Sequence, residues 1–538
     1  MPEQKSGGQK KRLLILGAGI MQGPAIRRAR EMGLETIVID GDPNAPLAAE
    51  ADRFEPVDLK DIVKIEAFAR CLQSEEAGLH GVMTAGTDFS ASVAWAAEKL
   101  GLPGIPYDTA LDASDKERMR SRFRDAGLPS PAFAVFRAPP PSAESVPFPF
   151  PAVVKPVDNM GGRGCRRADS FPELREAVES ALQFSRSGRA IVEEYMEGPE
   201  FSVDAVVYRG EVTICGLADR HIFFPPYFIE MGHTMPAAVS QKDREALTGV
   251  FIQGIRALGI DNGAAKGDIK LTSRGPMIGE IAARLSGGYM SGWTYPYASG
   301  VNPAGGAICA ALGREPEGLA PVRDWTSAER AFISIPGIVN SIEGIEKAKN
   351  IPYVKDLFFR AEPGRRVSFP ENNVSKAGNV ISAAPDRKTA VQAAENAART
   401  ILIRLDCPNA ETGAFLAGPL TAGVFPPPAF TLDAALLKML DTIPQTVPDT
   451  ILDGNFFSAF MESGLTDYMG RSPQETFEAI RQLTGLSLQP DANLGGKDAD
   501  LGREFWIALI RGGYQGAVYY IDYLINGKQC PGKERKLP

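Results

Sequence analysis

Cysteine and histidine are scarce in this 538-residue chain, and its first apolar run is short. The six cysteines are scattered and form no CxxC pair, which excludes a dense disulfide framework and predicts reduced thiols. Three isolated histidines, His80, His221 and His233, are too few for a zinc site of the usual ligand spacing. Gly17 ends the first apolar run too early for a signal sequence or a membrane span. These absences favour a cytoplasmic protein in which any bound metal is held by carboxylates.

An excess of basic residues is also absent. The net charge of −8 argues against nucleic acid as a partner, because affinity for the phosphate backbone rests on clustered Lys and Arg. An apolar fraction of 44% and a charged fraction of 23% are ordinary for a folded soluble chain and exclude extensive disorder. At this length we expect about two to four domains.

The N-terminal region alternates strand and helix patterns. A polar tail, residues 1–12, precedes a buried strand at Leu13–Leu16, then a glycine-rich turn and a helix, and a second strand at Thr36–Ile39. This order predicts parallel strands joined by a right-handed crossover. A third strand at Gly81–Thr84, with a helix after it, extends the same unit. We therefore expect a Rossmann-like α/β domain over residues 12–110.

The turn after the first strand, from Gly17 to Gly23, is similar to a dinucleotide-binding loop, with Asp40 at a suitable distance to hold a ribose. Its glycine spacing is one residue longer than that fingerprint. We therefore favour a tight strand-to-helix turn. An NAD-dependent oxidoreductase built on this loop remains an open alternative.

A second glycine-rich loop is more informative. Lys155 ends a predicted strand, and the loop that follows contains Gly161, Gly162, Arg163 and Gly164. Glycine allows the backbone N–H groups to approach an anion closely, so this loop and its two cationic side chains suit the oxygens of a triphosphate. The alternative is a surface loop without a ligand.

Two carboxylates occupy matching positions on a predicted hairpin, residues 266–285. Asp268 and Glu280 are equally far from Arg274, so a symmetric register places their Cβ atoms roughly 5 Å apart on one face. Like charges in this position need a cation between them, and Mg²⁺ is usually held by one or two carboxylates plus substrate phosphates. Arg284 shares that face, where it would meet developing phosphoryl charge. The alternative is a solvated hairpin with two ordinary acids.

Together these motifs resemble, in their order along the chain, those of the ATP-grasp superfamily. The resemblance implies an α/β chain with an ATP-grasp fold: a Rossmann-like pre-ATP-grasp domain, a small subdomain over 111–190, a large subdomain with the metal hairpin over 191–320, and a ligase C-terminal α/β domain over 321–425. Residues 430–538 lie outside it and are expected to form an added helical domain. The matching motifs are Asp115-Lys116, Val154-Lys155-Pro156, Gly161–Gly164, Glu193–Glu200 and Glu280–Gly288.

The resemblance also implies the roles of individual residues. The expected ATP-binding residues are Lys116, Lys155, Gly161, Gly162, Arg163, Gly164, Glu193, Glu194, Tyr195, Met196 and Glu200. The expected ligands of Mg²⁺, or of Mn²⁺, are Asp268 and Glu280. Lys155 and Arg284 are the expected catalytic residues, and the expected substrate-binding residues are Glu230, His233, Arg284, Gly287 and Gly288.

Within the superfamily the chain is most similar to the carbamoyl-phosphate-synthase-like and L-amino-acid-ligase-like branch, on Thr84–Asp88, Asp219–His221 and Phe228–His233. The implied function is an ATP- and Mg²⁺-dependent ligase that joins a carboxylate to an amine through an acyl phosphate, with an amino acid as substrate. Ala282 departs from the pattern, because many members have Asn there as a further metal ligand. Two alternatives therefore stay open: an enzyme using bicarbonate or another small carboxylate, and a nucleotide-binding homologue without activity.

The expected partners are small molecules, with neither nucleic acid nor membrane among them, and a homodimer is left open. The identity of the carboxylate and of the amine is not fixed by the sequence.

Overall fold

The computed structural model describes residues 10–443, 454–485 and 502–528. The chain divides into two compact units. The first unit consists of the residues up to Ile222, Glu230–Glu329 and Ile381–Val391, and the second unit of Phe223–Ile229, Arg330–Val380 and the residues from Gln392 onward. Most of the expected polar tail and parts of the expected helical domain lie outside the described residues. The domain boundaries expected from the sequence remain predictions.

The strands are β1 Arg12–Leu16, β2 Glu35–Asp40, β3 Arg53–Pro56, β4 Gly81–Thr84, β5 Phe133–Phe136, β6 Ala152–Pro156, β7 Arg166–Ala168, β8 Ala190–Glu194, β9 Glu200–Tyr208, β10 Glu211–Phe223, β11 Ile229–Met235, β12 Gly263–Thr272, β13 Gly275–Ala282, β14 Thr326–Phe332, β15 Gly337–Glu343, β16 Val354–Phe359, β17 Arg366–Val367, β18 Gly378–Ala384 and β19 Leu402–Leu405. The α-helices are α1 Gly23–Glu31, α2 Ile62–Ser74, α3 Ser90–Leu100, α4 Tyr107–Ser114, α5 Lys116–Asp125, α6 Phe171–Phe184, α7 Gln241–Leu258, α8 Tyr295–Ser299, α9 Pro303–Ala311, α10 Ile345–Lys349, α11 Arg387–Thr400, α12 Ala410–Leu416, α13 Ala434–Leu440, α14 Gly454–Met461, α15 Pro473–Thr484 and α16 Arg503–Lys528.

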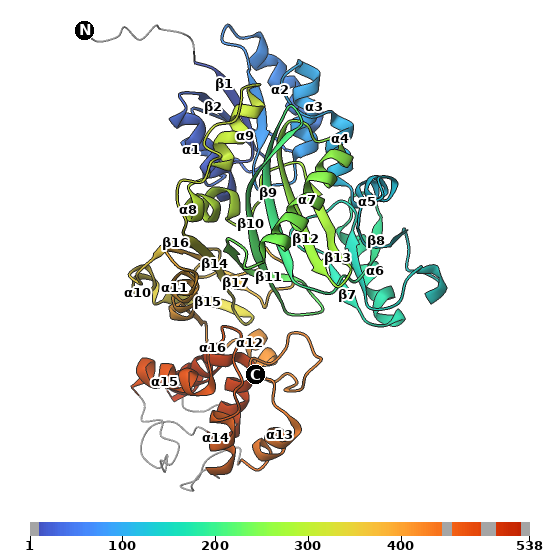
Figure 1. Ribbon diagram of the computed structural model, residues 1–538. Coiled ribbons are helices and arrows are strands. Elements are labelled where there is room, and N and C mark those ends of the chain that lie inside the picture. The colour runs from blue at the N-terminus through green and yellow to red at the C-terminus, as the bar shows by residue number, and fades with distance from the viewer. Residues whose placement is uncertain (1–9, 444–453, 486–501, 529–538) are drawn as a thin grey trace, which may run out of the picture. The chain divides into compact units, whose positions relative to one another are not determined.

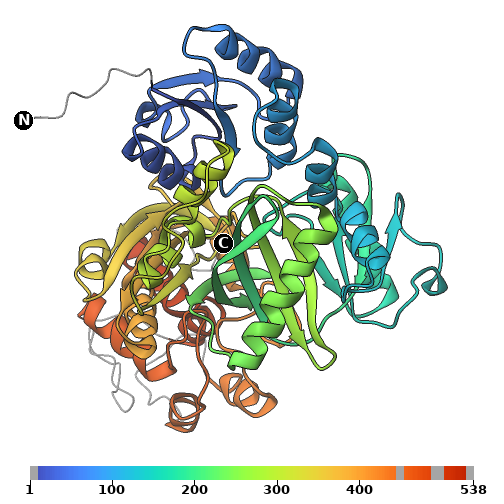
Figure 2. The ribbon, with the colours of Figure 1, turned by 45° about the horizontal axis from the view of Figure 1, so that its top comes forward.

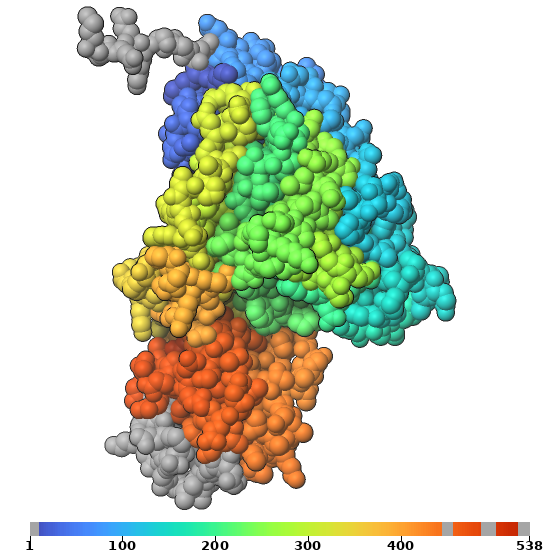
Figure 3. All heavy atoms as spheres, in the orientation of Figure 1, coloured from blue at the N-terminus to red at the C-terminus, as the bar shows by residue number. Residues whose placement is uncertain are grey.

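The N-terminal sheet of the first unit is parallel, as the sequence predicted, with strand order β3-β2-β1-β4. Leu13 and Ile15 of β1 pack against α1 and α9, whereas Leu14 and Leu16 pack against α2 and α3 on the other face. Helices cover both faces, which explains why the strand is a continuous apolar run. Figures 1 and 2 show α9 beside α1, and the space-filling view in Figure 3 shows the yellow atoms of this region against the dark blue N-terminal atoms.

The large sheet of the first unit has the strand order β13-β12-β9-β10-β11. Phe201, Val203 and Ala205 of β9 point to one face and pack in a core with α7, which Figure 2 shows lying across the green strands. Because side chains alternate along a strand, Ser202 and Asp204 point to the opposite face. We call this opposite side, which carries charged residues of β9, β12 and β13, the polar face.

A smaller antiparallel sheet of the first unit has the order β5-β8-β6-β7, and α6 packs on one of its faces. It places Lys155 near the end of β6 next to β8, which contains Glu193. The ATP-grasp fold expected from the sequence is thus present, with its parallel N-terminal sheet and antiparallel central sheets.

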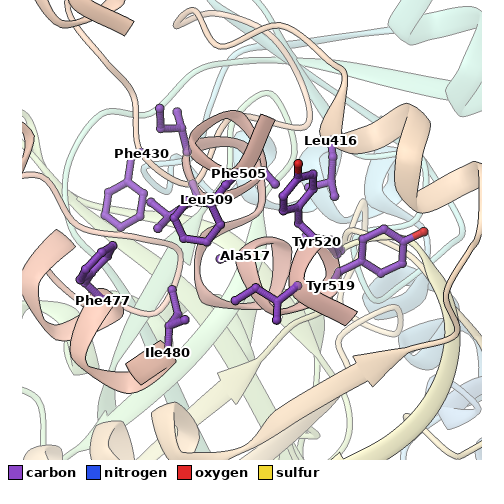
Figure 4. Close-up of a cluster of buried hydrophobic side chains, with 14 of the residues drawn as sticks. Leu416, Phe430, Phe477, Ile480, Phe505, Leu509, Ala517, Tyr519 and Tyr520 are labelled. Carbon is purple, nitrogen blue, oxygen red and sulfur yellow. The ribbon is translucent and has the colours of Figure 1, made fainter. Parts of the chain in front are cut away.

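The second unit has a sheet of order β17-β15-β19 and a helical C-terminal region, which was also expected. Its core holds aromatic and aliphatic side chains from α15 and α16, among them Phe477, Leu509 and Tyr519 (Figure 4). Gly513 interrupts α16 with φ 61° and ψ −148°, which bends the helix there. Among the described helices, none combines the length and the apolar character required to cross a bilayer.

Candidate functional site

The hairpin of β12 and β13 contains the two predicted metal ligands. Asp268 pairs directly with Glu280, which confirms the predicted register. Ser273 and Arg274 alone connect the strands, so the pairing near the turn is not symmetric about Arg274, and an extra residue at Gly279 restores the symmetric pairing further on. A Cβ at Gly279 would lie 2.9 Å from the carbonyl oxygen of Asp268, so the bulge requires glycine. Both carboxylates therefore belong to the polar face.

Cations of the chain surround Asp268. Arg220 Nη1 lies 3.0 Å from Asp268 Oδ1, and Lys266 forms a close ion pair with Oδ2. The Ser202 hydroxyl donates a hydrogen bond of 2.9 Å to Oδ1. Burial raises the pKa of Asp268, but Arg220 and Lys266 outweigh burial and hold this pKa below its ordinary value. Asp268 is therefore ionised at neutral pH, as a metal ligand must be.

Arg220 links three regions for which separate roles were expected. Its guanidinium forms ion pairs with Glu200, an expected ATP-binding residue, with Glu230 at 2.6 Å, an expected substrate residue, and with Asp268. Burial lowers the pKa of Arg220, but the three carboxylates outweigh burial and raise it well above its ordinary value. No role was expected for Arg220, although it lies in the Asp219–His221 segment on which the resemblance partly rested.

Lys155 is held by a buried ionic cluster. Its Nζ lies 2.7 Å from Glu193 Oε2, and Arg120 Nε lies 2.7 Å from Glu193 Oε1. Burial raises the pKa of Glu193, but the two cations outweigh burial and lower it to about 2. Glu193 is 1% exposed, so its carboxylate serves Lys155 and Arg120. Sequence reasoning missed Arg120 because it lies 73 residues away from its partner.

Lys116 lies between the second glycine loop and the metal hairpin. Its Nζ donates a hydrogen bond of 2.8 Å to the carbonyl of Asn159, and it is 3.9 Å from Glu280 Oε2. Asn159 begins the loop in which Gly161 and Gly162 have φ values of 69° and 76°, a region that favours glycine.

The remaining residues of that loop are placed as follows. Gly164 also has a positive φ, 68°, and a Cβ there would lie 2.9 Å from the ring of Phe184. Arg163 donates from Nε to the Met160 carbonyl at 3.2 Å, within its own loop. The loop therefore contacts itself. Lys155 lies on β6, the strand before the loop, and Lys116 lies on α5 and reaches the loop at Asn159.

The expected ATP-binding residues Glu194, Tyr195 and Met196 are fastened to the hairpin at two points. Lys270 Nζ donates a hydrogen bond of 3.0 Å to the Met196 carbonyl and lies 5.0 Å from the centre of the Tyr195 ring. Arg274 pairs with Glu194 at 2.7 Å. Tyr195 and Met196 therefore follow β8 in a fixed position beside β12.

The expected substrate residues Glu230, His233 and Gly288 lie next to one another. His233 is fully buried, with Nδ1 2.8 Å from Glu329 Oε2 and Nε2 3.5 Å from Glu230 Oε2. Gly288 has φ 59°, and a Cβ there would lie 2.9 Å from Glu230 Oε1. Burial lowers the pKa of His233, but Glu230 and Glu329 outweigh burial and raise it to about 9. His233 is therefore protonated at neutral pH, which argues against it as a general base.

Arg284 presents a buried donor at the end of the hairpin. It is 9% exposed, and its Nε has no hydrogen-bond partner among the described residues. The loop after it is fixed, because the Ser286 N–H and hydroxyl donate to Asp204 at 3.1 and 2.6 Å, and Gly287 packs against Gly86. A buried donor without a partner is costly, so Arg284 suits an anion that is present during function.

The first glycine loop is filled by a side chain of its own. Gly19 N–H donates to Gln22 Oε1 at 2.9 Å, and Ala18 N–H donates to Asp40 at 2.8 Å. A Cβ at Gly17 would lie 2.9 Å from the Gln22 side chain. The amides that would hold a pyrophosphate are therefore engaged, which favours a tight turn over a dinucleotide site.

The donor set fits a hard cation. In residues 10–443, 454–485 and 502–528, no group of three or more His, Cys, Asp or Glu side chains is arranged to hold a metal. Two opposed carboxylates suit Mg²⁺, which obtains its other oxygen ligands from phosphates and water. Ala282 pairs with Lys266 and supplies no oxygen ligand.

Sequence profiles of known families match three consecutive parts of this chain. They are the ATP-grasp N-terminal domain over residues 26–104, the ATP-grasp domain over 148–292, and the L-amino acid ligase C-terminal domain 2 over 331–406. The chain therefore belongs to the ATP-grasp superfamily. Within it, the third match groups the chain with proteins that have the L-amino acid ligase C-terminal domain.

Individual proteins agree with this assignment. The uncharacterized protein y4rH of Sinorhizobium fredii is 27% identical over 70% of this chain and 78% of its own length. Carnosine synthase 1 of Gallus gallus is 25% identical over 69% of this chain, but the alignment spans only 43% of that protein. The structure of L-amino acid ligase from Bacillus licheniformis matches 74% of this chain and all of its own with a TM-score of 0.65 and 24% identity, which establishes the shared fold.

The Glu193 cluster yields a prediction about stability. Glu193→Gln should cost about 3–5 kcal/mol, because Arg120 and Lys155 lose their shared carboxylate. The pKa of Glu193 in the folded protein, about 2, lies below its ordinary value of 4.5. Its contribution is therefore complete above pH 4.5 and disappears as the pH falls toward 2, so the two proteins should converge in acid. Urea unfolding at several pH values measures this difference.

The control is Glu194→Gln, whose partner Arg274 is largely exposed. It should change the free energy of unfolding by about 0–1 kcal/mol. Equal effects of the two substitutions would contradict the interpretation.

Proposed function

We propose that this chain is an ATP- and Mg²⁺-dependent ligase that joins a carboxylate to an amine through an acyl phosphate, with an amino acid among its substrates. The observation that carries the proposal is the polar face. There, two opposed carboxylates, Asp268 and Glu280, stand on the hairpin that leads to Arg284 with its unpartnered buried Nε. Metal ligands and an anion site within a few residues of each other suit phosphoryl transfer.

Lys116 and Lys155 would hold the phosphate oxygens of ATP. Lys116 is 3.9 Å from Glu280, so the same ammonium reaches both the glycine loop and the hairpin. Tyr195 and Met196, fixed by Lys270, would line the adenine, and Glu200 would bind the ribose. A divalent cation held by Asp268 and Glu280 would supply charge neutralisation for the transferred phosphoryl group.

In the first step, an oxygen of the substrate carboxylate bonds to the γ-phosphorus, and the bond from this phosphorus to the bridging oxygen breaks. ADP leaves with that oxygen. Arg284 would stabilise the acyl phosphate, because a guanidinium donates to two oxygens and stays charged at every relevant pH. The fixed loop of Ser286 and Gly287 would keep this guanidinium in place.

In the second step, the amine nitrogen bonds to the carbonyl carbon, phosphate leaves, and the nitrogen loses a proton. Glu230 suits recognition of an ammonium group, because its carboxylate lies beside Gly288 where a side chain would not fit. His233 is protonated at neutral pH and would serve as a positive partner for Glu230 rather than as the base.

We further propose that Lys266 takes over part of the charge that a second metal ion would supply. Lys266 pairs with Ala282, the position at which many family members have a further oxygen ligand, and its ammonium contacts Asp268. This arrangement supports a site for one cation.

The proposed function is tested by measuring phosphate release from ATP with amino acids supplied singly and in pairs, and by identifying the products by mass. An amide product, formed with one ADP and one phosphate, supports the proposal. ATP binding without phosphate release on a broad panel, including bicarbonate, would instead support a non-catalytic homologue.

Glu280→Gln and Arg284→Met should each lower the rate of ADP formation by about 10²–10³-fold, because each removes a charge that acts on the transferred phosphoryl group. Arg175→Met, an exposed arginine of α6 to which no role is assigned, is the matched control and should keep its activity. A coupled ADP assay measures the three rates. Full turnover in either of the first two variants would refute the roles given to them.

Lys266→Met should strengthen binding of Mn²⁺ in the absence of nucleotide by about tenfold or more, because it removes a cation that competes for Asp268. Electron paramagnetic resonance of free Mn²⁺ gives the affinity directly. Lys270→Met removes the same charge four residues further along the strand and should have a smaller effect. Weaker Mn²⁺ binding in the Lys266 variant would argue against Asp268 as a ligand.

A further inference from the structure

The C-terminal extension, which we define as the residues after 425, forms one wall of a charged cavity. This cavity of the second unit has a volume of about 490 Å³. One side is formed by β15, α10, α11 and β19, within the range matched by the L-amino acid ligase C-terminal domain 2. The other side is formed by α15, by α16 and by Arg471, which lies two residues before α15. None of the three matched families reaches this second side.

Two arginines are fixed in the wall by hydrogen bonds to neutral groups. Arg399 donates from Nε to the Met469 carbonyl and from Nη2 to the Gly470 carbonyl, both at 2.9 Å. Arg471 donates from Nη2 to the Arg399 carbonyl and lies 4.8 Å from the centre of the Tyr514 ring. These bonds fix the orientation of both guanidinium groups. Because the carbonyl acceptors are neutral, the bonds do not neutralise the positive charge.

Three cationic side chains line the cavity, Lys347, Arg399 and Arg471, and few carboxylates pair with them. Among the described residues, neither Arg399 nor Lys347 has a carboxylate within ion-pair distance. Arg471 has Asp467 at 3.5 Å, and Asp467 also accepts two backbone N–H groups. Burial lowers the pKa of Arg471, and Asp467 offsets this only in part. An anion in the cavity would supply the negative charge that these three cations lack.

The acids of the lining are already engaged. Glu343 pairs with Arg404 at 3.0 Å. Glu475 accepts the Ser472 N–H at 2.7 Å as part of the cap of α15. The lining has three cations, Lys347, Arg399 and Arg471, and two acids, so its side chains leave a net charge of +1 for a ligand.

We propose that this cavity binds a small anionic metabolite through Arg399, Arg471 and Lys347, and that the extension completes this site. The volume lies within the range of small-molecule sites, about 300–1,000 Å³. Guanidinium groups held in a fixed orientation recognise the oxygens of phosphates and carboxylates. The site belongs to the second unit, whereas the residues proposed to bind ATP belong to the first, so it is a separate site.

Calorimetric titration of the full chain with inorganic pyrophosphate, and separately with succinate, tests the proposal and distinguishes phosphate from carboxylate recognition. One of the two probes should bind saturably, and Lys347→Gln and Arg399→Gln should each weaken that binding by about tenfold or more. Lys347 is exposed, so its substitution leaves the fold intact. Lys349→Gln is the matched control, because Lys349 lies on the same helix, pairs with Glu346 and does not line the cavity.

A second control separates this cavity from the proposed ATP site. Pyrophosphate also suits the proposed ATP site, so Lys155→Gln should remove only the binding that occurs there, whereas the binding lost in Lys347→Gln should be retained, whether or not the chain proves to be a ligase. The proposal is overturned if neither probe binds, if Lys347→Gln and Lys349→Gln bind equally well, or if Lys155→Gln alone abolishes binding.

Discussion

The polar face depends on the compensation of buried carboxylates by cations of the same chain. Asp268 lies next to Arg220 and Lys266, and Glu193 lies between Arg120 and Lys155. A carboxylate removed from water without such partners would take up a proton, and it would then be useless as a metal ligand. The cations therefore keep the acids charged while no ligand is present, and they must be displaced or shared when one binds.

This constraint explains why the site is built on strands. Alternation sends Val203 of β9 into the core with α7 and Ser202 to the polar face, so one sheet supplies both a stable support and a row of charged side chains. The bulge at Gly279 keeps Asp268 opposite Glu280 despite a two-residue turn. A shift of one residue would turn both acids toward the apolar core that β9 forms with α7.

Local patterns predicted much of this molecule. Short-range spacing was enough for the parallel N-terminal strands, the hairpin and the pairing of its two acids. It was not enough for the cations beside the buried acids, because Arg220 lies 48 residues before Asp268 and Arg120 lies 73 residues before Glu193. Such contacts depend on how strands are ordered in the sheet, and no spacing along the chain encodes that order. The bulge at Gly279 was also not predicted, since a count that is symmetric about Arg274 does not distinguish a regular hairpin from a two-residue turn with a bulge.

Lys266 and Ala282 are best considered together, because the lysine supplies positive charge next to a position where the alanine side chain supplies no metal ligand. An alanine in place of an oxygen ligand would leave Asp268 and Glu280 with excess negative charge if nothing replaced the cation that such a ligand holds. Lys266 is the residue directly opposite Ala282, and its ammonium contacts Asp268. A fixed ammonium has no requirement for octahedral geometry and does not dissociate, but it also cannot bridge phosphate oxygens as a metal ion does. In the proposed ligase, the substitution would therefore keep the charge of the site and would leave the contact with phosphate to the single cation and to Lys116.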